Sequence, residues 1–243
     1  MLTEAALSSL RSALSAHGLM LRGGFNFLPE DKAPPGPSGK PARAVLLIGN
    51  AGQAMWPNFT AWLDRQPDVM ADPLDCWSAE VIDAAGWRAR GRAVYPNDRP
   101  FPPFQRWAMR AEGLKPSPLG ILMHPDHGLW HAYRGALLFD DEIAIQAPQK
   151  LIHLCDTCAE KPCLSACPVG AFSDAGYDVP ACAAHVVSAD GQACRSQGCL
   201  SRKACPIGED WRYSPAQQAF HQAAFLGSQL TAGRAKSTLE SGA

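Results

Sequence analysis

Residues 155–206 read CDTCAEKPCLSACPVGAFSDAGYDVPACAAHVVSADGQACRSQGCLSRKACP, and this stretch sets what the rest of the chain must support. It holds eight of the nine cysteines of the 243-residue chain. Both halves of the stretch end in Cys-Pro, at Cys167-Pro168 and Cys205-Pro206. This repeated ending indicates two related metal-binding halves.

The first half has the spacing Cys155-x2-Cys158-x4-Cys163-x3-Cys167-Pro168. It resembles the bacterial ferredoxin run, whose fourth cysteine ligates the other cluster in two-cluster proteins. A tight loop supplies the first two thiolates and the next turn supplies the third, as a cubane cluster requires. The proline then ends the helical turn.

The second half is a looser repeat of the first, with Cys182 followed by Cys194-x4-Cys199-x5-Cys205-Pro206. Eight thiolates suit two four-iron clusters with four ligands each. The spacing assigns one cluster to Cys155, Cys158, Cys163 and Cys205, and the other to Cys167, Cys182, Cys194 and Cys199.

Zinc and disulfide bonds are the alternatives for these cysteines. Zinc sites also use cysteine pairs at short spacing, whereas disulfides suit small secreted domains. The two Cys-Pro endings favour iron–sulfur clusters, and so does the total of eight cysteines in two sets of four that interleave along the chain. Cys76 has no cysteine near it in sequence and is expected to be a small buried side chain.

Length and composition bound the architecture and the partners. A chain that is 47% apolar can bury a sizeable core and allows one large domain plus a small appendage. The formal net charge of -1 gives no basic footprint, so no nucleic-acid partner is expected. No run approaches the roughly 18 apolar residues of a membrane span. The N-terminus, with Glu4, resembles an amphipathic helix more than a signal peptide, so we expect a cytoplasmic protein without a membrane partner.

Hydrophobic periodicity predicts alternating helices and strands, an α/β (α+β) chain. The predicted helices cover 3–16, 55–65, 75–85, 105–111 and 215–225. The predicted strands cover 19–22, 44–49, 93–95, 121–123 and 136–139, with Gly23-Gly24 ending the first. Three regions are predicted. Residues 1–150 form an N-terminal domain, residues 151–227 form a cluster module with a closing helix, and residues 228–243 form a flexible tail.

Two segments of the N-terminal part could carry chemistry. Asn50-Ala51-Gly52 follows a strand as a nucleotide loop would, but GNAGQA lacks the spacing of a dinucleotide fingerprint. The turn His124–His131 holds three histidines. Pro125 and Gly128 prevent a regular helix that would present the three histidines together. This favours a turn lining a pocket over a metal site.

The pieces AVLLIGNAG, DPLDCW, YPNDRP and ILMHPDHGLWHAYRGALLF resemble, in the same order, the cobalamin-processing family whose loss causes combined methylmalonic aciduria and homocystinuria. The resemblance covers about residues 40–145. It implies a nitroreductase-like sheet flanked by helices that binds cobalamin base-off and removes its upper ligand reductively. That family carries no clusters.

The combination with the C-terminal cysteines resembles epoxyqueuosine reductase and, more distantly, reductive dehalogenases, which join a similar cobalamin domain to two four-iron clusters. All eight cysteines match that pattern. The spacing between Cys158 and Cys163 is longer, the second group is stretched, and no counterpart of the C-terminal repeat region for transfer RNA is present. Transfer-RNA modification is therefore not expected. The sequence also has no Asp-x-His-x-x-Gly, so no protein ligand to the cobalt from below is expected.

The resemblance implies that cobalamin binds near the turn and the following strand, at His124, Gly128, Trp130, Arg134 and Gly135. Gly128 and Trp130 would offer close backbone approach and an apolar wall. Arg134 matches an arginine of the cobalamin-processing family; a surface ion pair is the alternative.

Asp98 lies in the rigid loop Pro96–Pro100 and is the candidate proton donor. The cobalamin-processing family has arginine at this position, whereas epoxyqueuosine reductase has its catalytic aspartate at a comparable distance before the following helix. The alternative is an aspartate that only caps its turn.

Together these features predict a cobalamin-binding iron–sulfur oxidoreductase. Its clusters would deliver low-potential electrons from a reductase or ferredoxin, either to remove the upper ligand or to reduce a small substrate. The alternatives are a non-catalytic ferredoxin-type electron carrier and a flavin-dependent reductase that holds FMN.

Overall fold

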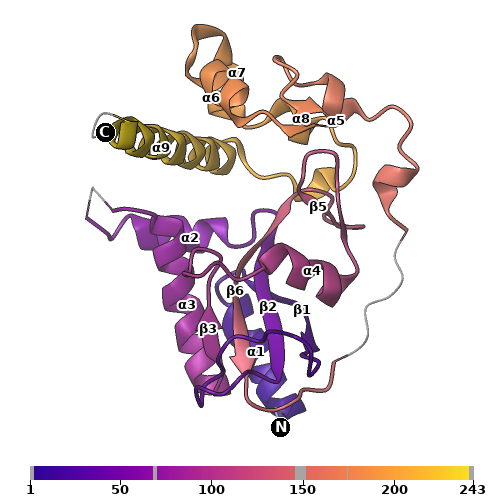
Figure 1. Cartoon of the computed structure of the whole chain (residues 1–243), viewed down its shortest axis with the longest axis vertical. Coiled ribbons are helices and arrows are strands. Elements are labelled where there is room, and N and C mark those ends of the chain that lie inside the picture. The colour runs from indigo at the N-terminus through magenta and orange to yellow at the C-terminus, as the bar shows by residue number, and fades with distance from the viewer. Residues whose placement is uncertain (1–2, 68–69, 146–151, 174, 241–243) are drawn as a thin grey trace. The chain divides into compact units, whose positions relative to one another are not determined.

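The structure, a computed structural model, describes residues 3–67, 70–145, 152–173 and 175–240. The chain forms two compact units (Figure 1). The first unit comprises 1–115 and 130–153, and the second comprises 116–129 and the chain from 154 onward. Residues 116–129, predicted to belong to the N-terminal domain, lie in the second unit. The predicted boundary at 150 and 151 lies outside the described residues.

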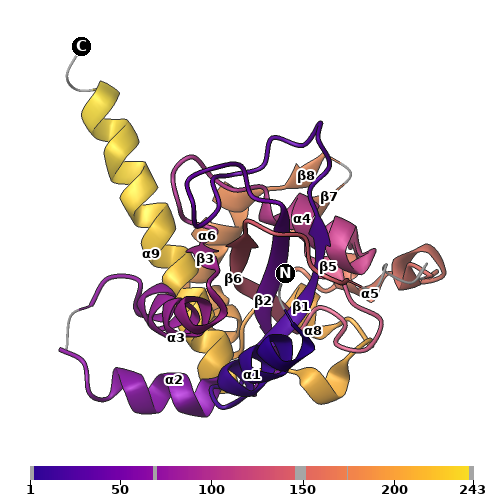
Figure 2. The same cartoon turned by 90° about the horizontal axis from the view of Figure 1, so that it is seen from below.

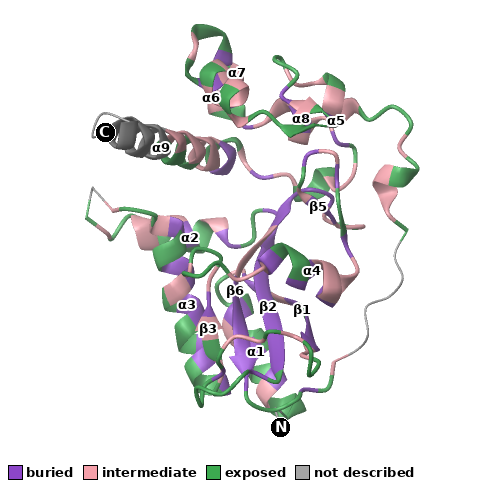
Figure 3. Ribbon diagram, viewed as in Figure 1, coloured by how far each residue is buried: buried purple, intermediate pink, exposed green. Residues whose placement is uncertain are grey.

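A four-stranded antiparallel sheet forms the centre of the first unit. Its order is β1 (Met20–Asn26), β2 (Ala44–Ala51), β6 (His131–Phe139) and β3 (Arg92–Val94). All eight residues of β2 are buried, as the continuous apolar run predicted (Figure 3). A strand buried on both faces needs a cover on each side of the sheet.

Helices supply that cover on both faces of the sheet (Figure 2). α1 (Glu4–Ser15) and α3 (Pro73–Ala89) pack together against one face, and α2 (Trp56–Leu63) packs on α3. α4 (Phe104–Glu112) packs on β1 and β2. The predicted α/β class is confirmed.

Glycine lets α3 approach the sheet closely. A Cβ added at Gly86 would lie 2.7 Å from Leu137 Cδ2, and one added at Gly135 would lie 2.8 Å from Ile82 Cδ1. Gly135 therefore has a packing role between β6 and α3.

Three local predictions differ from the structure. β1 does not end at Gly23-Gly24 but continues through them with a bulge, because Gly23 adopts a φ of 75°. β6 begins at His131, before the predicted strand start at Ala136. Cys76 is exposed on α3, so its predicted burial is wrong.

The second unit consists of short elements and one long helix. β4 (Lys115–Pro116) pairs with β5 (Leu122–Met123), and β7 (Phe172–Ser173) pairs with β8 (Gly176–Tyr177). The short helices are α5 (Pro162–Ser165), α6 (Val179–Val187), α7 (Gln192–Gln197) and α8 (Leu200–Lys203), with 3-10 turns η1 (Leu154–Asp156), η2 (Ala189–Gly191) and η3 (Glu209–Trp211).

The long helix is α9 (Pro215–Glu240), and it begins where predicted. Ser214 Oγ accepts a hydrogen bond from the Gln217 N–H at 3.1 Å. The helix continues through 228–240, which were predicted to belong to a flexible tail, and no proline interrupts that segment. Among the described residues, no helix is both long enough and apolar enough to cross a membrane.

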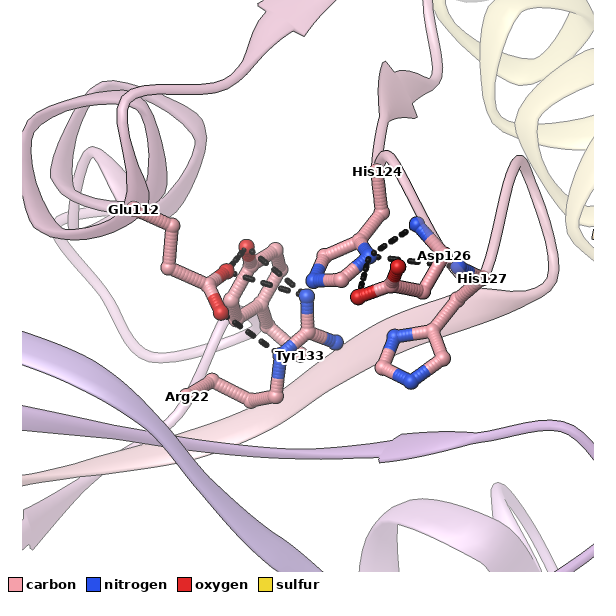
Figure 4. Close-up of polar contacts among 6 residues, drawn as sticks. All are labelled: Arg22, Glu112, His124, Asp126, His127 and Tyr133. Atoms are coloured by element: carbon pink, nitrogen blue, oxygen red, sulfur yellow. Dashed lines mark hydrogen bonds and ion pairs between the residues drawn. The ribbon is translucent and has the colours of Figure 1, made fainter. Parts of the chain in front are cut away.

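A buried ion pair joins β1 to α4 (Figure 4). Arg22 donates to both carboxylate oxygens of Glu112, at 2.9 and 3.0 Å, and the Tyr133 hydroxyl donates to the same carboxylate. The side chains of Arg22 and Glu112 are 2% and 15% exposed. Burial is the main reason that the pKa of Tyr133 is raised above its ordinary value, so its hydroxyl stays protonated.

We expect Glu112→Gln to destabilise the chain by about 3–5 kcal/mol, because it leaves the buried Arg22 cation without its counter-charge. Glu4→Gln is the matched control, since it removes the exposed Arg11–Glu4 pair and should cost at most about 1 kcal/mol. Urea unfolding of both variants measures the difference. Equal losses would show that burial does not strengthen the Arg22 pair.

Candidate functional site

Four cysteines of the second unit line one cavity of about 260 Å³. We call them the first cysteine group: Cys155, Cys158, Cys163 and Cys205. Cys155 lies in η1, Cys163 lies in α5, and Cys205 follows α8. Cys163 and Cys205 are buried, and the other two are partly exposed.

The other four cysteines line a second cavity of about 250 Å³. We call them the second cysteine group: Cys167, Cys182, Cys194 and Cys199. Cys182 lies on α6, Cys194 lies on α7, and Cys199 caps α8. These two groups have the membership that the spacing assigned. Iron–sulfur ligation by them remains a prediction.

Each set of thiols is close enough for its members to affect one another's ionisation. Burial raises the pKa of the Cys155 thiol to about 11, and Cys205, Cys163 and Cys158 add to the rise. Burial likewise raises the pKa of the Cys199 thiol, with a further contribution from Cys182 and Cys167. Four thiolates in one cavity therefore need positive charge to hold them there.

All nine cysteines lie in the described part of the chain, and none forms a disulfide bond. Within the same described ranges, no three His, Cys, Asp or Glu side chains converge as the ligands of a single metal ion do. What the members of each cysteine group share is a cavity.

The hairpin 116–129 borders both cavities. Its Leu119, Met123 and Leu129 form a buried cluster with Cys163 and Cys205. Ile121 and Leu119 also line the second cavity. Sequence analysis did not connect this hairpin with the cysteines, although the spacing of two between Leu119, Ile121 and Met123 marks one apolar face.

Gly128 closes the turn at the end of this hairpin. His124 and Gly128 exchange backbone hydrogen bonds, both 3.0 Å long. Gly128 has a φ of 56°, and a Cβ added there would lie 1.9 Å from the Ile207 carbonyl oxygen. The close backbone approach predicted for Gly128 is thus made to Ile207, two residues after Cys205.

Two of the three histidines predicted to share the turn stack on each other, whereas His131 lies on β6 in the first unit. His124 Nδ1 accepts from the backbone N–H groups of Asp126 and His127, at 3.1 and 3.2 Å, which assigns the ring hydrogen to Nε2 (Figure 4). The His124 ring stacks on His127 at 4.1 Å between centroids, and the His127 ring meets Trp211 edge-on at 4.4 Å.

Three of the residues predicted to bind cobalamin lie in the first unit. Trp130 is fully buried. Arg134 Nε donates to Asn50 Oδ1 at 3.1 Å, and its charge opposes the raised pKa that burial gives Asp75. Gly135 is the packing residue described above. The other two, His124 and Gly128, belong to the second unit, and cobalamin binding by all five remains a prediction.

Asp98 makes the contacts of a turn cap. Its Oδ2 accepts from the Tyr95 N–H at 2.8 Å, and its own N–H donates to the Tyr95 carbonyl at 3.1 Å. Its side chain is partly exposed. The proton-donor role remains a prediction beside this structural one.

No protein-family model matches the sequence, and no curated protein matches it. Among solved structures, the chain is similar to epoxyqueuosine reductase with an epoxyqueuosine-modified tRNA stem loop (12% identity, TM-score 0.52, covering 87% of this chain and 66% of that one). It is also similar to epoxyqueuosine reductase from Bacillus subtilis (13%, TM-score 0.50, 87% and 66%).

A third similar structure is the C. elegans B12-trafficking protein CblC, a homologue of human MMACHC (13% identity, TM-score 0.52, covering 92% of this chain and 95% of that one). The chain spans just under two thirds of the two epoxyqueuosine reductase chains. At these identities the likeness concerns the fold.

We expect Gly128→Ala to loosen the hairpin from the segment after Cys205, because the added Cβ meets the backbone of Ile207. Gly170→Ala is the control, since Gly170 has nearly the same φ, 58°, with nothing within 4 Å of an added Cβ. The control should cost only the left-handed conformation, about 1–2 kcal/mol. Hydrogen–deuterium exchange of residues 116–129 should accelerate in Gly128→Ala alone; equal protection in both variants would contradict the packing role.

Proposed function

We propose that this chain is a cobalamin-binding iron–sulfur reductase with one four-iron cluster in each cysteine cavity. The observation that carries the proposal is the division of eight thiols into two groups of four around cavities of similar volume. The groups interleave along the chain, since Cys167 follows α5 of the first group and Cys205 follows α8 of the second. This is the sharing of ligands that two-cluster ferredoxins use.

The donor set and the space fit such a cluster. A single zinc ion draws its four thiolates to about 2.3 Å from one point. Here the four thiols of each group line, together with apolar side chains, a cavity of about 250–260 Å³. The first group would hold one cluster and the second group the other.

Bound clusters would supply one-electron transfer at a potential that the surroundings tune. The chain contributes to that tuning through its own groups. The Ala171 N–H donates to Cys167 Sγ at 3.3 Å, which stabilises a thiolate there. Leu129 and Met123 keep water away from Cys163 and Cys205.

The cobalamin part of the proposal rests on the fold likeness to CblC and epoxyqueuosine reductase together with the sequence resemblance. Reducing cobalamin requires low-potential electrons, which four-iron clusters can provide. Arg134 and Asn50 offer polar contacts in the first unit, and Asp98 is proposed as the proton donor of a reductive step. A reductase or ferredoxin would be the electron donor.

The proposed partners are cobalamin or a small-molecule substrate and an electron donor. One similar structure holds a tRNA stem loop, but the net charge of -1 supports a small-molecule substrate rather than nucleic acid. A cytoplasmic location suits thiols that must stay reduced. FMN in place of cobalamin, or no second cofactor at all in an electron carrier, are the competing functions.

Anaerobically reconstituted protein should contain about eight irons per chain, as two four-iron clusters require. Cys163→Ala should reduce the count to about four. Cys76→Ala is the control and should leave it unchanged, because Cys76 is exposed in the first unit. Stoichiometric zinc, or a count unaffected by Cys163→Ala, would overturn the assignment.

Hydroxocobalamin titrated into the reconstituted protein should change its absorbance spectrum and elute with the chain on gel filtration. We expect Arg134→Ala to weaken this binding about tenfold or more, the scale of losing one charge-assisted contact. FMN binding with no cobalamin response would favour the flavin reductase, and binding of neither would favour the carrier.

If cobalamin binds, Asp98→Asn should retain binding but slow turnover between about pH 6 and pH 8. An unchanged rate would leave Asp98 only its turn-capping role.

A further inference from the structure

Arg202 lies between the two cysteine groups, on the four-residue helix α8 that separates Cys199 from Cys205. It is one of the residues that line the second cavity. Its Nε and Nη2 both donate to the Leu129 carbonyl, at 3.1 and 2.6 Å. Leu129 in turn lines the first cavity. Arg202 therefore lines one cavity, and its guanidinium is bonded to the wall of the other.

The position of this cation is fixed from two sides. Its guanidinium carbon lies 4.6 Å from the centroid of the Tyr213 ring. Tyr213 and Leu129 are 3% and 1% exposed. A forked bond to a buried carbonyl and a stacked aromatic ring hold a guanidinium more rigidly than they could hold an ammonium. The charge of Arg202, a residue that lines the second cavity, is therefore held in place.

A fixed, partly buried cation has a strong effect on a neighbouring group that gains an electron. The attraction between opposite charges grows as water is excluded from around them, and it favours the reduced form of a cluster. The first cavity is also lined by a lysine, Lys161, but that residue is exposed and its charge is screened by solvent. The second cavity is thus lined by a partly buried arginine, and the first by an exposed lysine.

We propose that Arg202 raises the reduction potential of the cluster held by the second cysteine group above that of the other, so that the second group receives the first electron. The inference rests on the proposed function. The step is the uptake of one electron from a one-electron donor such as a ferredoxin. It forms and breaks no bond and requires no proton.

Two full-length variants that each retain one cluster test the order directly. Cys163→Ala retains the second group, and Cys182→Ala retains the first. In redox titrations followed by electron paramagnetic resonance, the Cys163→Ala chain should be reduced at the higher potential. The reverse order, or equal potentials, would overturn the inference.

Arg202→Gln tests the cause of that order. In the Cys163→Ala chain it should make reduction at least tenfold less favourable, which is about 59 mV for a one-electron couple. In the Cys182→Ala chain the shift should be smaller. Arg202→Lys keeps the charge and should restore most of the potential.

Lys203→Gln is the matched control, because Lys203 is the next cation on α8, lines neither cavity and bonds Gln197 at 3.0 Å. It should shift neither potential. A shift as large as that of Arg202→Gln would show that overall charge, not Arg202, sets the order. If Arg202→Gln loses iron, the order of the single-cluster chains and the Arg202→Lys potential still decide. Absence of four-iron clusters from the unaltered chain would instead overturn the proposed function.

Discussion

The packing of apolar side chains around the cysteines is the constraint on which the second unit depends. Helices of four residues, such as α5 and α8, are far too short to be stable alone, because forming the first helical turn costs more than it returns. Here α5 and α8 pack on each other, and apolar side chains of the hairpin 116–129 pack on Cys163 in α5 and on Cys205 just after α8. The same packing keeps the thiols out of water and raises the pKa of Cys163 and Cys205. A cation bound among the thiols would offset the cost of ionising them there.

The first unit meets a different constraint, the burial of β2 on both faces. Helices must then cover the sheet on each side, and the close approach of α3 requires Gly86 and Gly135. On the other face, the Arg22–Glu112 pair puts a hydrogen-bonded charge pair where β1 meets α4. A buried pair of this kind contributes less to net stability than to fixing one arrangement, because desolvation offsets much of the attraction.

Sequence reasoning worked where the information is local. The cysteine spacing assigned the two groups that line the two cavities, and the apolar run identified β2. It failed where distant contacts decide the outcome. The hairpin 116–129 belongs with the cysteines because of packing against residues more than 30 positions away, which no local pattern encodes. Cys76 was wrongly expected to be buried, since composition alone does not say which face of α3 points outward. The bond from Arg202 to Leu129 spans 73 positions and had no local signal.

Interleaving of the two groups has a consequence for how the cavities affect each other. The chain leaves the first cavity at α5 to supply Cys167 to the second, and it leaves the second at α8 to supply Cys205 to the first. The backbone N–H groups of Arg202 and Ser201 are directed at the Cys199 thiol, while the Arg202 side chain bonds Leu129 of the first cavity. A displacement of α8 must therefore alter hydrogen bonding at the second group and the wall of the first together. The hydrogen bonding at the second cysteine group and the packing of the first cavity therefore depend on the same four-residue helix.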